Sequence, residues 1–203
     1  MSPRTYNRTR RAAAAQETRR RIVAAAIRLH SRRGSSATSW DDIAAAAGVS
    51  RATVYNHFGS LDELIPACAS DAFTAIDPPT ADQAAGVFAG LATLEARICR
   101  LIAENCLCYE AGAEWLRTAW AERDFVPAMG DAVWRVQDGL ARLVDAVLAE
   151  SAAGPAERRL LLSALDFSFW DTLVRAGFSS KDVPAQIERM VLPVLESLTK
   201  ERR

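Results

Sequence analysis

The sequence has 203 residues, 50% of them hydrophobic, and its 25 basic residues balance its 25 acidic residues. This composition argues against a disordered chain, and no apolar run approaches the roughly 20 residues of a membrane span or forms a signal segment, so we expect a cytoplasmic protein without a membrane partner. The neutral total hides an asymmetry, because residues 1–60 hold eleven arginines against three acidic residues, a pattern that favours a basic nucleic-acid-binding module over a chance run of surface arginines.

Apolar positions recur at helical spacing along the chain and strand-like alternation is absent, which predicts an all-α fold. The first helix is expected over residues 16–33, with Gly34 ending it. Residues 1–15 before it form a basic arm. Either this arm contacts a DNA minor groove or phosphates, or it is a solvated tail. Its arginines are Arg4, Arg8, Arg10 and Arg11.

Two short helices follow the first one. The second helix opens at residues 38–39, where each residue has an acidic residue three positions later as in a capping box, and it stops at Gly48. Ser50 then caps a third helix that ends near Phe58. Two short helices joined by a turn with glycine fit a helix-turn-helix, although such turns also occur in proteins that never bind DNA.

The third helix has one face suited to DNA. At helical spacing, Val54 and Phe58 face the core, and Ala52 and Asn56 point the opposite way. The two flanks hold hydrogen-bonding groups: Arg51 with Tyr55, and Thr53 with His57. A small residue between polar flanks allows close approach to base edges with phosphates on either side.

This stretch closely resembles the DNA-binding signature of the TetR (tetracycline-repressor-like) family. The motifs that match best are Ala46-Ala47-Gly48-Val49-Ser50, Thr53-Val54-Tyr55 and His57-Phe58, and the resemblance covers about residues 16–64. It implies a DNA-binding transcriptional regulator, most often a ligand-released repressor, that binds a palindromic operator as a homodimer. The expected partners are double-stranded DNA, a second copy of the chain and a small molecule.

The resemblance also implies roles for single residues. Ser39, Thr53, Tyr55 and His57 would lie near phosphates, with Arg51 and Asn56 as base readers and Ala52 between them. Two positions depart from the family pattern. His30 stands where a large aromatic residue is usual and is expected to be packed, and Leu61 replaces a phosphate-contacting lysine at the start of the fourth helix.

The fourth helix is expected from Ser60, which forms a capping box with Glu63, to Ile76, where two prolines break the pattern. Because the family resemblance ends near residue 64, residues 16–64 are assigned to the DNA-binding domain and residues 65–203 to a helical regulatory and dimerisation domain. Five longer helices are expected in the second domain, over residues 87–109, 113–122, 127–152, 155–176 and 182–199.

Two of these helices are predicted to form the dimer. Residues 160–174 are apolar nearly all round, and the last helix presents an apolar stripe, so two copies of each would build a four-helix interface. The interface residues named by this pattern are Leu161, Phe167, Ile187, Val191, Val194 and Leu198.

Aromatic residues predict the class of effector. If the family's pocket is present, some of them line it and the ligand is apolar or aromatic, whereas aromatic residues at helical spacing are more often simply core. The candidates are Trp115, Trp120, Phe125, Trp134, Phe167 and Trp170. Glu104, Glu110 and Glu114 would either select a cationic ligand or form a solvated face.

No cofactor, metal site or enzymatic activity is expected. The four cysteines lack the spacing of a disulfide framework and suit a reducing compartment, with a thiol redox sensor as the minority interpretation. Cys106 and Cys108 point apart on a helix and so cannot share one metal ion. The chain has only two histidines, and neither a glycine-rich phosphate loop nor a nucleophile motif is recognisable.

Overall fold

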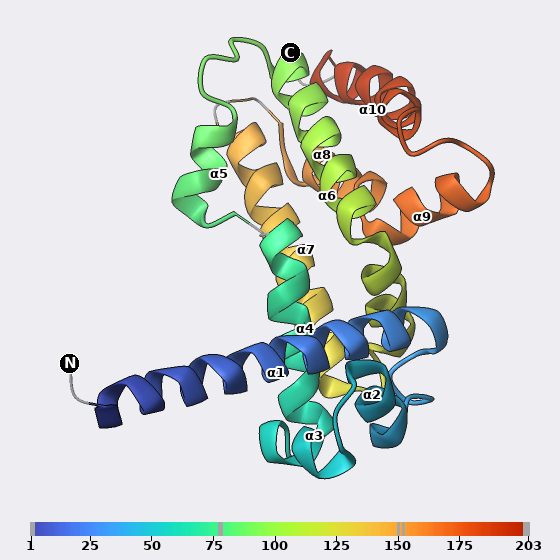
Figure 1. Cartoon of the computed structure of the whole chain (residues 1–203). Coiled ribbons are helices and arrows are strands. Elements are labelled where there is room, and N and C mark those ends of the chain that lie inside the picture. The colour runs from blue at the N-terminus through green and yellow to red at the C-terminus, as the bar shows by residue number, and fades with distance from the viewer. Residues whose placement is uncertain (1–2, 77–78, 150, 152, 201–203) are drawn as a thin grey trace. The chain divides into compact units, whose positions relative to one another are not determined.

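The chain folds into α-helices in a computed structural model that describes residues 3–76, 79–149, 151 and 153–200. The all-α prediction is confirmed, since no strand occurs in these ranges. The helices are α1 (Pro3–Arg33), α2 (Trp40–Ala47), α3 (Arg51–His57), α4 (Leu61–Ile76), α5 (Ala81–Val87), α6 (Leu94–Glu122), α7 (Pro127–Leu148), α8 (Pro155–Ala164), α9 (Phe167–Arg175) and α10 (Val183–Lys200) (Figure 1). Among the described residues, none of these helices is long and apolar enough to cross a membrane.

The helices group into two compact units that are not contiguous in sequence. The first unit comprises residues 1–72 and 117–132, and the second comprises residues 73–116 and 133–203. The predicted boundary after residue 64 therefore differs from the observed grouping, because α4 packs with the first unit as far as residue 72 and the end of α6 joins that unit as well.

The first unit is built on apolar residues that meet between α1, α2, α3 and α4. Ile22, Ile43, Val54, Phe58 and Leu64 are all fully or almost fully buried in one cluster. Burying an aliphatic or aromatic side chain of this size stabilises the fold by about 1.5 to 3 kcal/mol. Val54 and Phe58, which were predicted to face the core, thus join residues of α1, α2 and α4 in the core that positions the candidate DNA-binding surface.

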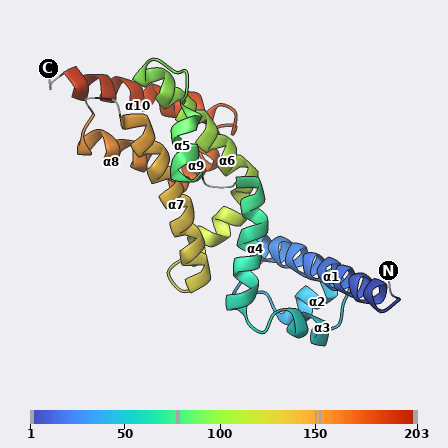
Figure 2. The ribbon, with the colours of Figure 1, turned by 90° about the vertical axis from the view of Figure 1, so that its left-hand side faces the viewer.

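Helix α1 begins earlier than predicted, at Pro3 rather than near residue 16. Proline is favoured in the first turn of a helix, and the alanines and arginines that follow are strong helix formers, so nothing in this stretch stops the helix. Figures 1 and 2 both show the first half of α1 projecting beyond α2 and α3. The predicted arm is therefore helical over its described part, from Pro3 onward.

Three helix predictions beyond residue 76 are wrong. Helix α5 was not predicted; Thr80 accepts from the backbone of Gln83 and Gln83 accepts in return, which forms a capping box. Helix α6 is one helix where two were predicted, because Gly112 lowers helix propensity without ending the helix. The predicted helix over residues 155–176 is split, since Asp166 caps a new helix by accepting from the Ser168 amide.

An aromatic cluster lies beside the break between α8 and α9. The ring centroids of Tyr109 and Phe167 are 5.3 Å apart, and those of Phe167 and Trp170 are 5.7 Å apart. The Leu165 carbonyl, at the break itself, accepts from the Tyr109 hydroxyl at 2.9 Å and from the Asn105 amide at 3.0 Å. Burial raises the pKa of Tyr109 well above its ordinary value, so this hydroxyl remains a donor.

Most of the residues predicted to form the dimer interface are instead buried in the core of the single chain. Leu161, Phe167, Ile187 and Val191 are each at most 1% exposed. They are unavailable to a partner because the chain's own helices already cover them. Met190 and Val194 are large hydrophobic side chains exposed on the described part of α10, while the side chain of Leu198 lies outside the described residues.

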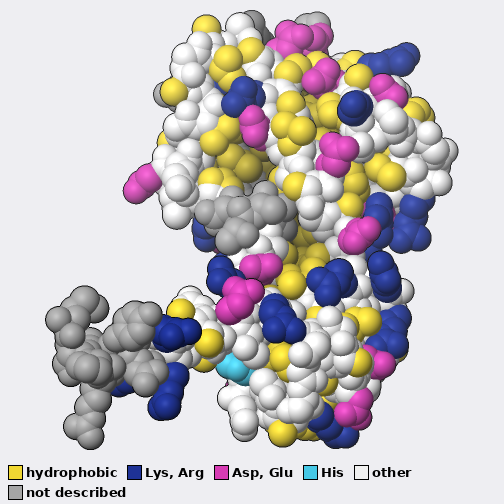
Figure 3. Space-filling model, viewed as in Figure 1, with side chains coloured by type: hydrophobic (Ala, Val, Ile, Leu, Met, Phe, Trp, Pro, Cys, Tyr) yellow, Lys and Arg dark blue, Asp and Glu magenta, His cyan; other side chains and the backbone are white. Residues whose placement is uncertain are grey.

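The six aromatic residues predicted for a ligand pocket are divided between the two units. Trp120 and Phe125 belong to the first unit, and the other four belong to the second. Phe125 and Trp134 are more than 60% exposed, whereas the remaining four are buried. Phe167 and Trp170 lie in one aromatic cluster with Tyr109. Hydrophobic side chains also reach the surface of the second unit, as the yellow atoms in Figure 3 show.

The four cysteines form no disulfide, and their thiols are poor nucleophiles. Burial raises the pKa of Cys68 and Cys106 to about 12 and that of Cys108 to about 11, and it also raises the pKa of Cys99. A reactive sensor thiol needs a lowered pKa, because the thiolate is the species that reacts. This environment tells against the minority interpretation of a redox sensor.

Candidate nucleic-acid interface

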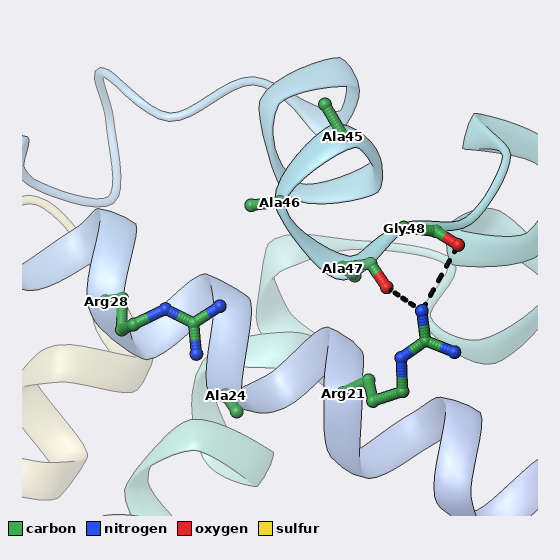
Figure 4. Close-up of a pocket in the computed structure, with 7 residues that line it drawn as sticks. All are labelled: Arg21, Ala24, Arg28, Ala45, Ala46, Ala47 and Gly48. Carbon is green, nitrogen blue, oxygen red and sulfur yellow. Dashed lines mark hydrogen bonds between the residues drawn. The ribbon is translucent and has the colours of Figure 1, made fainter.

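The turn between α2 and α3 depends on Gly48 and Arg21. Gly48 adopts a left-handed conformation, with φ of 65°, that favours glycine. The Arg21 guanidinium, from α1, donates to the carbonyls of Ala47 and Gly48 and so ties the turn to the first helix (Figure 4). A Cβ atom at Gly48 would lie 2.8 Å from this guanidinium, so a side chain here would adopt a strained backbone conformation and would also displace Arg21.

Helix α3 presents the face that the sequence predicts. The Ser50 hydroxyl accepts from the Thr53 amide at 3.1 Å and starts the helix, and Val54 and Phe58 are buried beneath it. Ala52 and Asn56 are both exposed on the outer side. An exposed helix with a short residue between hydrogen-bonding groups has the shape needed to enter a major groove.

Arg19 fixes the far end of α3. Its guanidinium lies 4.0 Å from the centre of the Phe58 ring and donates to the His57 carbonyl at 3.0 Å. The arginine thus supplies a cation beside a helix C-terminus, where the helix dipole favours positive charge. This role was not predicted from the sequence, although Arg19 belongs to a run of three arginines in the middle of α1.

Arg51, a predicted base reader, already has partners on the protein. Its guanidinium donates to the Asp41 carboxylate at 2.9 Å and lies 5.5 Å from the centre of the Tyr55 ring. The Tyr55 ring in turn lies 5.1 Å from that of Trp40. Arg51 and Tyr55 share one flank as predicted, but Asp41 was missed as a member of this site. Its position three residues after Thr38 suggested only a capping role.

Two hydroxyls predicted to contact phosphates serve as caps or neighbours of caps. The Ser39 hydroxyl accepts from the Asp42 amide and donates to its carboxylate at 2.5 Å, while the Thr53 hydroxyl lies 2.8 Å from that of Ser50. Both serine caps were predicted from the sequence, and the capping box of α2 is confirmed. A phosphate at either hydroxyl would therefore share it with the helix terminus.

The start of α4 is acidic rather than basic. Leu61 is half-buried as its first residue, followed by exposed Asp62 and Glu63. The Glu63 carboxylate accepts from the Gly59 amide at 2.8 Å, one residue before the cap predicted at Ser60. Carboxylates stabilise a helix N-terminus but repel a DNA phosphate, so this terminus is a poor site for an anion.

The remaining basic candidates are spread over α1. Arg8, Arg10 and Arg11 are exposed on its projecting half, whereas the side chain of Arg4 lies outside the described residues. His57 is half-buried at the end of α3. Figure 3 shows basic side chains over the surface of the first unit with acidic ones among them.

His30 is packed, as predicted. It is completely buried, and neither ring nitrogen has a hydrogen-bond partner among the described residues. Burial lowers the pKa of His30 from 6.5 to about 4; the charge of Glu122 raises it and that of Arg33 lowers it further. The ring is therefore neutral at pH 7 and fills the space of the aromatic residue for which it substitutes.

Comparison with known proteins agrees with this geometry. The sequence model of the family described as bacterial regulatory proteins, tetR family, matches residues 22–68, which span the last part of α1 to the middle of α4. No curated protein sequence matches the chain.

Several solved structures share the fold over most of the chain. A tetR-family transcriptional regulator from Mesorhizobium loti MAFF303099 is 18% identical with a TM-score of 0.64, covering 90% of this chain and 97% of its own. A tetR-family regulator from Streptomyces coelicolor is 19% identical with a TM-score of 0.64, covering 93% and 84% respectively. A transcriptional regulator from Saccharomonospora viridis in complex with choline is 21% identical with a TM-score of 0.61, covering 87% and 96%.

Proposed function

We propose that this transcriptional regulator of the tetR family is a repressor that binds a palindromic operator as a homodimer and leaves it when a small molecule binds. The observation that carries the proposal is the exposed outer face of α3, held by the Gly48 turn in a domain that matches the family. Such a regulator acts by binding alone, without chemical turnover of its ligand.

In the proposed complex, α3 enters the major groove with Ala52 at its centre. Asn56 and Arg51 read base edges, and Tyr55 and His57 approach phosphates on the two sides. The hydroxyls of Ser39 and Thr53 already hydrogen-bond at the helix caps. Each can therefore contact a phosphate only through a lone pair or proton that these bonds do not use. Two copies of α3 would meet successive major grooves, which requires a palindromic site with half-sites about one helical turn apart.

For the effector, the aromatic cluster of Tyr109, Phe167 and Trp170 supports an apolar or aromatic molecule. The Trp170 indole nitrogen is buried with no hydrogen-bond partner among the described residues, which leaves one donor for an acceptor on a ligand. The choline complex of the Saccharomonospora viridis relative supports small-molecule binding by proteins of this fold. For the dimer, the exposed Met190 and Val194 of α10 provide the apolar surface.

The deciding experiment tests the full-length protein against DNA upstream of its own gene and of the neighbouring genes. Footprinting should reveal a palindromic site, and fluorescence anisotropy should give a salt-dependent affinity that one class of apolar or aromatic compounds weakens. If no fragment is bound more tightly than unrelated DNA of equal length, the repressor proposal is wrong. Conversion of a compound without any effect on DNA binding would also contradict it.

A further inference from the structure

A buried carboxylate occupies the loop between α1 and α2. Glu122, the last residue of α6, is only 6% exposed. Its two oxygens accept from the Ser35 amide at 2.9 and 3.1 Å, from the Ser36 amide at 3.3 Å, and from the Ser35 hydroxyl. Three donors from two adjacent residues therefore converge on one side chain that lies 86 and 87 positions away in the sequence.

The loop is shaped for this carboxylate. Gly34 adopts a φ of +86°, and a Cβ atom there would lie 2.6 Å from a Glu122 oxygen. One turn earlier on α6, the Thr118 hydroxyl donates to the His30 carbonyl at 3.1 Å, so α6 grips both the end of α1 and the loop that follows it. Ser35 is itself fully buried. We call the Glu122 carboxylate, together with the hydrogen-bond donors of Ser35 and Ser36, the loop seat.

The loop seat lies directly before the part of the chain that leads to the DNA-binding residues. The Thr38 hydroxyl donates to the Gly34 carbonyl at 2.7 Å, and Ser39 then caps α2. Asp41, in the first turn of α2, holds Arg51 of α3. A change in the path of the loop would therefore move the N-terminus of α2 and, through Asp41, the side chain of Arg51.

Removing the carboxylate leaves a specific defect. The amide and the hydroxyl of Ser35 would remain buried without an acceptor, and the Ser36 amide would lose its partner. Burying unpaired donors costs more than an exposed hydrogen bond contributes. The loop would have to open to hydrate them. Because residues 94–116 of α6 belong to the second unit and residues 117–122 to the first, the acceptor is supplied by a helix that both units share.

We infer that Glu122 is a positioning residue for DNA binding, whose carboxylate closes the loop between α1 and α2 and so holds α2 and Arg51 in the binding arrangement. The inference rests on the proposed operator binding. It assigns to the end of α6 a direct part in the DNA-binding competence of the first unit, without any contact between Glu122 and DNA.

The test compares Glu122→Ala with Asp124→Ala, a matched control whose carboxylate is 85% exposed two residues away. Operator affinity is measured by anisotropy at a temperature where circular dichroism shows both variants fully folded. We expect Glu122→Ala to weaken operator binding by about tenfold or more and Asp124→Ala to bind like the wild type. Equal affinity of the folded Glu122→Ala variant and the wild type would overturn the inference.

Formate provides a readout that separates positioning from loss of stability. Replacing chloride by formate at constant ionic strength should restore much of the affinity of Glu122→Ala, because a small carboxylate fits the vacated seat, and should leave the wild type and Asp124→Ala unchanged. If formate does not restore the weakened binding of Glu122→Ala, the loss of a carboxylate from the loop seat is not the cause, and the inference is contradicted. If Glu122→Ala does not fold, Glu122→Gln replaces it in the test. We expect Glu122→Gln to bind the operator more weakly than the wild type, but by less than about tenfold. Wild-type affinity of Glu122→Gln would refute the inference. Failure of the wild type itself to bind any operator would instead refute the proposed function.

Discussion

At the scale of single residues, Asp41 places a negative charge on the surface proposed to face DNA. Its carboxylate holds the Arg51 guanidinium at 2.9 Å, yet both side chains are more than half exposed. An exposed ion pair of this kind contributes little to stability, with typical values of about 0 to 1 kcal/mol. Its expected effect therefore concerns the direction in which Arg51 points and the electrostatic attraction of DNA.

We predict that Asp41→Asn binds non-specific DNA a few-fold more tightly and discriminates less well at one base pair of each half-site. The first effect follows from removing a charge that repels phosphates, and the second from releasing Arg51. Anisotropy with operator variants measures both. Asp62→Asn is the matched control, because this exposed carboxylate does not bind Arg51 and should raise affinity for all sequences alike. Unchanged discrimination in Asp41→Asn would show that the pair does not orient Arg51.

His30 makes the stability of the protein depend on pH. The folded chain keeps a pKa of about 4 at this ring, compared with 6.5 when unfolded. Between these values the unfolded chain binds a proton that the folded chain does not bind, so stability is lost as the pH falls from 6.5 towards 4. The loss attributable to His30 is on the order of 3 kcal/mol.

The variant His30→Phe should remove this part of the pH dependence, because it restores an aromatic ring without a titrating group. Urea unfolding of both proteins between pH 4.5 and 7 gives the comparison, and the variant should gain stability relative to the wild type as the pH falls. Parallel stability curves would mean that His30 is not the responsible group.

The individual side chains differ in how far the sequence could predict them. The outer face of α3 follows from helical periodicity alone, so Ala52 and Asn56 lie where expected. The ion pair of Arg51 with Asp41 could not be predicted in this way, because the two residues lie on different helices and no local sequence pattern specifies how those helices cross. Glu122 was missed for the same reason, since its partners are Ser35 and Ser36 on a distant loop.

At the scale of elements, the N-terminus of α4 is the point where this chain departs from the family's basic pattern. Leu61 is half-buried, so a longer side chain at this position can keep its apolar stem in place and extend its charge into solvent. We therefore predict that Leu61→Lys melts at nearly the wild-type temperature and binds DNA more tightly at low salt. The slope of log affinity against log salt should steepen by about 0.9 per subunit.

A salt series with thermal melts on the same preparations checks this prediction. Leu61→Gln is the matched control, because it changes polarity without adding charge and should leave the slope unaltered. A lower melting temperature with an unchanged slope in Leu61→Lys would show instead that Leu61 serves only to pack α3 against α4.

The helices themselves were predicted where local signals are strong. Gly48 and the serine caps fixed the ends of α2 and α3 because a left-handed residue and a capping hydroxyl act within one turn. Local signals failed over residues 160–174, where apolar side chains on every side suggested one helix. There the Asp166 cap marks the start of a new helix, but the apolar pattern obscured this signal. The buried Tyr109 and Asn105 side chains, which are distant in sequence, bind the Leu165 carbonyl and stabilise the break.

At the scale of the whole molecule, the proposed homodimer needs an apolar surface on the outside of the chain. Met190 and Val194 lie one turn apart on α10 and are 52% and 44% exposed. We predict that Met190→Asp with Val194→Asp yields a folded monomer in analytical ultracentrifugation that binds the operator more weakly, because a charge at each position must be desolvated to form the interface.

Two control variants test whether Met190 and Val194 themselves form the dimer contact. Val191→Asp, at a position 1% exposed in the single chain, should unfold the protein rather than dissociate it. Trp134→Asp alters an apolar residue that is 63% exposed on α7 and should leave the dimer intact. A stable dimer of the double variant would place the interface elsewhere.

The division of the chain into units that interleave along the sequence limits how such proteins can be recombined. A fragment ending at residue 72 would lack residues 117–132, including the carboxylate that fills the loop between its first two helices. If the sensor domain of another protein were fused to residues 1–72, the Ser35 donors would meet a different hydrogen-bond acceptor or would have no acceptor. A working chimera would have to retain residues 117–132 of this chain and replace the segments on either side of them. The DNA-binding unit therefore cannot be transferred as one continuous segment.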